Sequence, residues 1–174
     1  QFELSGDGGF TPTTARVKTA TNYHTRDVIP RVAGNELYYV GLDGHRSMLY
    51  EYRTYEESLV AAATDVSTQI PTLIGSSVRS MAVTGNTRFA ILCPSASSTL
   101  YVYRAHWDGI NKRQSAWSKY VFDASYSIND VVVLADRVYM LTKTANIWFI
   151  ERIPMLEYPG STHYDDVTVN DPTF

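Results

Sequence analysis

Short runs of apolar and aromatic residues, separated by polar turns, recur in three stretches of this chain. The stretches are VIPRVAGNELYYVGLDGHRSMLYEY from Val28, VRSMAVTGNTRFAILCPSASSTLYVY from Val78 and INDVVVLADRVYMLTKTANIWFI from Ile128. Their starts differ by 50 residues each time (78 − 28 and 128 − 78). Residues typical of hairpin turns separate the runs; they are Gly34-Asn35, Asp43-Gly44, Gly85-Asn86 and Ala135-Asp136. Each stretch therefore predicts three antiparallel strands joined by short turns.

Each repeat also has a candidate fourth strand further along the chain. In the second repeat it is SAWSKYVF at 115–122, in the first it lies within 59–68, and in the third it is DDVTV at 165–169. The segment YEESLVAAATDV at 55–66 is the main candidate helix, because its alanine run favours helix. A short helix and an extended edge strand are both open for that segment.

These repeats predict an all-β fold of antiparallel, four-stranded blades, with blade-like units at about 28–68, 78–122 and 128–169. A four-stranded unit that recurs every ~40–50 residues is typical of a β-propeller. Propellers usually close with about four to eight blades, so the chain is predicted to be part of an irregular propeller or an irregular stack of sheets. Because it begins at Gln1 and QFELSG already reads as a strand, we expect a single domain, 1–174, taken from a larger protein.

One predicted hairpin, LYVYRAHWDGINKRQSAWSKYVF at 100–122, combines aromatic residues with cations around Asp108-Gly109. Side chains alternate along both of its strands, as two-faced strands require. We expect Trp117 to pack on a neighbouring blade and residues 106–115 to form a loop facing partners or a lumen. Candidate partner contacts in that loop are His106, Trp107, Lys112 and Arg113. Cations expected at strand ends or on the outer face are Arg104, Lys112, Arg113 and Lys119.

Composition and charge narrow the functions open to this hairpin. The aromatic and cationic side chains of this hairpin would also suit a stacking platform for single-stranded nucleic acid or a contact between subunits. The formal net charge of −3 disfavours a generic DNA-binding domain, which would be basic, but allows a protein through which DNA passes. The 13 tyrosines favour strands and subunit interfaces. No apolar run approaches the ~20 residues of a membrane span, and no signal peptide is visible.

The sequence carries no strong catalytic, phosphate-binding or metal-binding motif. We therefore expect a protein that is not an enzyme and binds no metal or cofactor. GDGG at 6–9 lacks the surroundings of a phosphate loop, and the single cysteine, Cys93, is expected to be a buried structural thiol. No two histidines have the spacing of a zinc helix; His163 beside Asp165 and Asp166 is the best metal candidate, in a predicted loop. The carboxylates available for sugar cleavage are Glu51, Glu56, Glu57 and Asp65. Glu51 interrupts an aromatic strand, and we interpret it as an outward-facing side chain.

An ordered series of segments resembles the tail tubular protein B family, the nozzle proteins of short-tailed phages similar to T7. QFELSG and FTPTT come first, then LYYV, LYEY, DVSTQIPTLIGSSVRSMAV and finally LYVYRAHWDGINKRQSAWSKYVF, covering about residues 1–150. The last segment resembles the family pattern sAW.kw.f, whose positions here are Ala116, Trp117, Lys119, Tyr120 and Phe122. Tyr120 stands where the family often has a second Trp, and Phe10 where it often has Leu; both changes keep an apolar or aromatic side chain.

The resemblance implies a structural component of a phage tail that forms part of the DNA-ejection conduit. It implies a homo-oligomeric ring, a hexamer, that docks adaptor, portal and tail-fibre proteins and passes DNA without specific binding. It also implies propeller-like β domains and a place in the virion tail after synthesis in the host bacterial cytoplasm. The alternatives are a tail module that binds or hydrolyses capsule polysaccharide, motivated by aromatic residues and spare carboxylates, and an extracellular adhesion propeller.

Overall fold

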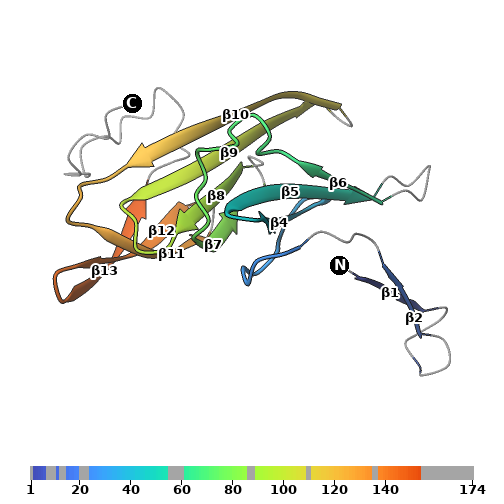
Figure 1. Ribbon diagram of the computed structural model, residues 1–174, viewed down its shortest axis with the longest axis horizontal. Helices are drawn as coiled ribbons and strands as arrows, with labels where there is room; N and C mark the ends of the chain where they lie inside the picture. Colours follow the sequence, from blue (N-terminus) through green and yellow to red (C-terminus); the bar gives the residue numbers. More distant parts are fainter. Residues whose placement is uncertain are drawn as a thin grey trace.

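The computed structural model describes residues 2–6, 11, 15–19, 24–54, 61–85, 89–108, 111–134 and 137–153. These residues form 13 strands and, within the described ranges, no helix. All neighbouring strands pair antiparallel, so the all-β, antiparallel prediction is confirmed. Strands β1 (Phe2–Gly6) and β2 (Ala15–Thr19) form a hairpin that Figure 1 shows apart from the other strands.

The remaining strands form three sheets, each built from strands that follow one another in the chain. The first sheet has the order β3 (Arg31–Ala33), β4 (Glu36–Asp43), β5 (Arg46–Thr54) and β6 (Ala61–Asp65). The second sheet contains β7 (Val78–Val83), β8 (Phe89–Pro94), β9 (Thr99–Asp108) and β10 (Asn111–Val121), also in chain order across the sheet. The third sheet has three described strands, β11 (Ser127–Leu134), β12 (Arg137–Thr144) and β13 (Ile147–Ile153).

Glycine sets two of the tight turns in the first sheet. Gly34 follows β3 and Gly44 follows β4, and their φ angles are 62° and 56°. A two-residue hairpin loop that begins with a positive φ favours glycine at that position, because other residues meet a steric penalty there. Two turns predicted from the sequence therefore form where expected.

The second sheet is the middle layer of a three-sheet stack (Figure 1). One core joins its Met81, Leu92 and Tyr103 to Tyr38 and Leu49 of the first sheet. A second core lies on its other face; its larger members are Phe89, Ile91, Leu100, Val102, Ile128, Val131, Val138 and Met140. Strand β8, FAILCP, is buried along its whole length because both of its faces are covered. This double coverage explains a continuous apolar run in place of alternation.

Several sequence expectations can be compared with these strands. Residues 61–65 of the candidate helix form edge strand β6, so the extended alternative holds there, and 55–60 lie outside the described residues. The predicted loop at 106–115 is wrong for its described part: 106–108 continue β9 and 111–115 begin β10. The predicted fourth strand at 165–169 lies outside the described residues. The described sheets stack without closing a ring of blades.

Candidate functional site

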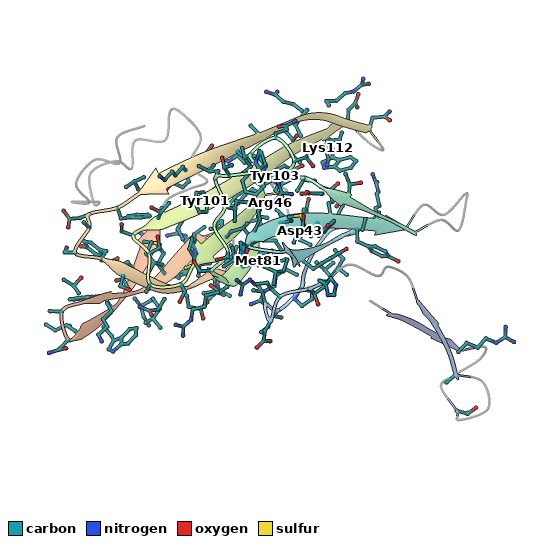
Figure 2. All side chains as sticks on the ribbon, viewed as in Figure 1. Asp43, Arg46, Met81, Tyr101, Tyr103 and Lys112 are labelled. Atoms are coloured by element: carbon teal, nitrogen blue, oxygen red, sulfur yellow. The ribbon has the colours of Figure 1, made fainter. Side chains whose placement is uncertain are left out.

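Charged and aromatic side chains gather between the first and second sheets, near the turn end of the β9–β10 hairpin. We call this group the inter-sheet polar cluster. Its members are Glu36, Tyr38, Glu51 and Arg53 from the first sheet and Tyr103, Trp107 and Lys112 from the second. Figure 2 labels Tyr103 and Lys112 where the hairpin lies above the first sheet. The cluster adjoins the apolar core between these sheets, so its charges are in a largely desolvated environment.

Strand alternation and register bring the first-sheet members onto one face. Tyr38 of β4 stands opposite Glu51 of β5, and Glu36 stands opposite Arg53. Side chains two residues apart on a strand share a face, so Glu51 and Arg53 project on the same side as Leu49. Leu49 belongs to the core with the second sheet, and this identifies the direction in which the polar side chains point.

A β-bulge places Lys112 in the same interface. Lys112 pairs with Trp107, but the next pair is Gln114 with His106, so Arg113 is an extra residue in β10. A bulge of this kind switches the face to which the flanking side chains point. Without it, strict alternation from Trp117 would place Lys112 on the opposite face. Lys112 is the second residue of β10, so the expectation of a strand end holds, while the bulge turns its side chain into the interface.

Glu51 and Lys112 form the ion pair that links the two sheets. Lys112 Nζ lies 2.8 Å from Glu51 Oε1, and the Tyr38 hydroxyl donates a 3.0 Å hydrogen bond to Glu51 Oε2. The Glu51 side chain is 6% exposed and that of Lys112 is 24% exposed. Both carboxylate oxygens are thus engaged, and the short separation in a partly buried setting makes the interaction stronger than a surface pair.

A second set of contacts continues the cluster around Trp107. The guanidinium of Arg53 lies 4.7 Å from the centre of the Trp107 ring, and Lys112 Nζ lies 5.1 Å from it. Arg53 Nε is also 3.9 Å from Glu36 Oε1, and Glu36 is fully buried. Cations from both sheets therefore meet one indole ring, an arrangement that is favourable through cation–π attraction.

The protonation equilibria of the cluster follow from burial and from the ion pair. Burial by itself would lower the pKa of Lys112, but the hydrogen bonds and charge of Glu51, with Tyr103, hold this pKa above its ordinary value. Burial, followed by the charge of Glu51 and the hydrogen bond to it, raises the pKa of Tyr38 well above its ordinary range. Burial also raises the pKa of Tyr103. Near neutral pH both phenols stay protonated and Lys112 stays charged.

This geometry makes the cluster a cross-link between sheets and corrects our interpretation of Glu51. Glu51 does not face outward: it is buried against the second sheet and paired with Lys112. A general acid or base must reach a substrate, whereas Glu51 already uses both oxygens inside the interface. The break that Glu51 makes in the aromatic strand was a usable signal for a special contact, although its direction was misassigned.

The other candidate carboxylates and histidines do not add a reactive centre within the described residues. Asp65 lies 3.6 Å from Arg46 and accepts hydrogen bonds from the Ser67 amide and hydroxyl. Glu56, Glu57, His163, Asp165 and Asp166 lie outside the described residues. No group of three potential ligands among the described histidine, cysteine, aspartate and glutamate side chains could hold a metal ion. Cys93 is buried, and burial raises the pKa of its thiol to about 11.

The four predicted partner contacts separate into two groups. His106 and Arg113 are exposed, and Arg113 pairs with Asp108 at 2.9 Å. Trp107 and Lys112 are half-buried members of the inter-sheet polar cluster. The structure thus brings only part of this set to the surface, and the partner-contact role of these residues stays a prediction.

A family model described as bacteriophage nozzle protein matches residues 1–170. The chain belongs to the bacteriophage nozzle protein family. The resemblance drawn from the ordered segments is therefore confirmed. Membership in this family implies a structural component of the virion tail with tail-assembly partners. The matching family is a structural one, and no enzyme family is evident. A search of curated proteins finds no match to this chain. Among the described residues, no helix has the length and hydropathy to cross a membrane.

The segment 116–122, in β10 and the residue after it, contributes to both cores of the sheet stack. Trp117 packs on the core with the first sheet, and its Nε1 donates a 2.9 Å hydrogen bond to the carbonyl of Val66, just beyond β6. Tyr120 and Phe122 pack on the opposite core with the third sheet. Ala116 and Lys119 are exposed. The alternating aromatic positions of this nozzle chain therefore fasten the second sheet to its neighbour on each side.

Proposed function

We propose that this nozzle chain contributes propeller-type blades to the wall of the tail conduit through which DNA leaves the virion. The three units, at about 28–68, 78–122 and 128–169, would be blades of one domain within a ring of six copies. That ring would dock adaptor and portal proteins and tail fibres. The single observation that carries the proposal is the family match over residues 1–170.

The sheet stack supports an architectural role in such a wall. Two of its sheets are four-stranded meanders, and consecutive sheets pack face to face, as consecutive blades do. The inter-sheet polar cluster would fix how two blades sit on one another, since a buried ion pair is satisfied in one arrangement only. Side chains used in this way serve assembly instead of turnover.

The charge of the chain supports a conduit that DNA can slide through. Its formal net charge is −3, so a wall of many copies would repel phosphates instead of gripping them. We expect no shift of duplex DNA by the purified protein in a gel at physiological salt. Strong, salt-sensitive retention of DNA would contradict this part of the proposal.

Electron microscopy of the virion tests the main proposal. We expect density for this chain within a ring of six copies in the tail, with protein beneath the adaptor and around an axial channel. A nozzle protein that stays monomeric with or without adaptor, or density for this chain at a fibre tip, would overturn it. Synthesis in the host bacterial cytoplasm, part of the same proposal, is tested by fractionating infected cells before lysis.

A further inference from the structure

The last described strand of the third sheet carries four consecutive exposed apolar side chains. Their exposed fractions are 61%, 52%, 43% and 78% for Ile147, Trp148, Phe149 and Ile150 of β13. Exposed apolar residues on a protein surface are normally scattered singly, and a contiguous patch marks an interaction site. Figure 1 shows β13 at one end of the sheet stack, away from the β1–β2 hairpin. This strand is therefore available to a partner outside the stack.

Both faces of β13 are uncovered, and this distinguishes two kinds of partner. Phe149 stands opposite Thr142, which lies on the same side of β12 as the core residue Val138, so Phe149 is on the core side of the sheet. Trp148, the preceding residue, points to the outer side. A protein sheet packed on the outer side would leave Phe149 and Ile147 in water. A bilayer interface surrounds the edge of a sheet and takes up side chains from both faces.

The outer face of the third sheet continues the apolar surface of β13 across all three described strands. Its exposed apolar side chains are Val132, Leu134, Leu141, Trp148 and Ile150. A surface of this kind can lie in the plane of a membrane, with its apolar side about 5–10 Å deep at the boundary between headgroups and acyl chains. Tryptophan is enriched at that depth because its ring is apolar while its indole N–H reaches water.

The charge around this face suits anionic headgroups. The β12–β13 hairpin, 137–153, carries Arg137, Lys143 and Arg152 against Glu151, a net charge of 3 − 1 = +2. The whole chain is −3, so the rest of it carries −3 − 2 = −5. All three cations point to the outer side by strand alternation. Among the described residues, the one acid on that side is Asp130 of β11, the strand farthest from β13. Positive charge is therefore concentrated beside the apolar face.

We propose that β13 and the outer face of the third sheet bind the surface of an anionic phospholipid bilayer. Trp148 and Ile150 enter the boundary between headgroups and acyl chains, with Phe149 beside them at the sheet edge. Lys143 Nζ lies 5.4 Å from the centre of the Trp148 ring, so its stem covers apolar surface while its ammonium reaches headgroup phosphates together with Arg152. This contact goes beyond the proposed conduit role, which it complements by holding the tail against a membrane that DNA crosses.

Flotation of the unmodified chain with lipid vesicles tests the binding. We expect the chain to float with phosphatidylglycerol vesicles and to bind less to phosphatidylcholine vesicles. Lys143→Gln combined with Arg152→Gln should weaken binding to phosphatidylglycerol about fivefold for each cation removed. Trp148→Ser combined with Ile150→Ser should also weaken it, because apolar area no longer enters the interface. Circular dichroism checks that these variants keep their strands.

Two pairs of variants elsewhere in the chain match these changes. Arg79→Gln with Lys119→Gln removes two exposed cations of the second sheet. Ile29→Ser with Val32→Ser removes two exposed apolar side chains beside and within the first sheet. We expect both pairs to bind vesicles as the parent chain does. Absence of flotation with phosphatidylglycerol, or equal losses in test and control pairs, would overturn the proposal.

Brominated lipids show whether Trp148 itself enters the bilayer. Bromine on the acyl chains quenches a nearby indole, and we expect this quenching to be lost in Trp148→Phe, which keeps an aromatic ring and still floats. Unchanged quenching from Trp107 and Trp117 would contradict the proposal. Dimers that form without lipid and disappear in Trp148→Ser with Ile150→Ser would assign this face to a second copy and also overturn it. The conduit role is tested separately, by ring assembly in the virion.

Discussion

Lys112→Met tests the inter-sheet polar cluster most directly. It removes the ammonium that lies 2.8 Å from Glu51 Oε1 and leaves a carboxylate that is 6% exposed, still bonded by the Tyr38 hydroxyl. With an effective dielectric constant of ~20, Coulomb's law gives about 6 kcal/mol of attraction at this separation. Desolvation of the two groups offsets much of it, and removing one partner of a buried pair costs about 3–5 kcal/mol. Because Lys112 is 24% exposed, we expect a loss of about 2–4 kcal/mol in the free energy of unfolding.

Urea unfolding of four proteins measures the coupling within this pair. The proteins are the parent chain, Lys112→Met, Glu51→Gln and the double variant. We expect the double variant to be more stable than the sum of the single losses predicts, with a coupling free energy of about 1–3 kcal/mol. Replacing both members leaves no buried charge without its partner, which is why the double loss is smaller.

Arg113→Met is the matched control on the same strand. It removes a contact of similar length, 2.9 Å to Asp108, but these side chains are 60% and 66% exposed. We expect a change of less than about 1 kcal/mol, as for other exposed pairs. Equal losses for Lys112→Met and Arg113→Met, or additive losses for Lys112 and Glu51, would refute the buried cross-link.

The remaining predictions concern the core and its ionisable groups. Trp117→Phe removes the hydrogen bond to the Val66 carbonyl, and we expect urea unfolding to show a loss of about 1–3 kcal/mol in the free energy of unfolding. An unchanged urea midpoint would contradict a stabilising role for this indole hydrogen bond. Because the pKa of Cys93 is raised to about 11, we expect its thiol to resist a thiol-reactive dye in the native protein and to react in urea; rapid native labelling would show that it is accessible. The folded-state pKa values of Tyr38 and Lys112 are raised above 10.0 and 10.5, so their stabilising contribution is complete below these values and is lost as pH rises through the folded-state values. Urea midpoints should therefore fall above about pH 10, and a smaller fall is expected in Lys112→Met.

Much of the secondary structure could be predicted because its causes are local. Turn residues such as Gly34 and Gly44 and the aromatic runs between them indicated the strands of the first sheet. The segment 55–66 was ambiguous, because alanine favours helix in isolation. Its described part became β6 through pairing with β5, a contact that helix propensity does not include.

The polar cluster could be predicted only in part. Glu51 was noticeable as a break in the aromatic repeat, but its partner is 61 positions away in the chain (112 − 51). The direction of Lys112 depends on the bulge at Arg113, and alternation alone does not predict it. Trp117 was expected on a neighbouring blade, and it does contact the segment beyond β6 through Val66.

The sequence by itself determined most of the strands, their antiparallel pairing and the family to which the chain belongs, but it did not fix the strand ends near 106–115 or the strand at 61–65. These features depend on residues close together in the chain: side-chain alternation, turn chemistry and the order of short motifs. Only the tertiary structure decided that the second sheet is covered on both faces and that Glu51 and Lys112 meet in an interface. Burial and ion pairing depend on which sheet lies against which face, and the stacking of whole sheets sets this, together with one irregular residue in β10.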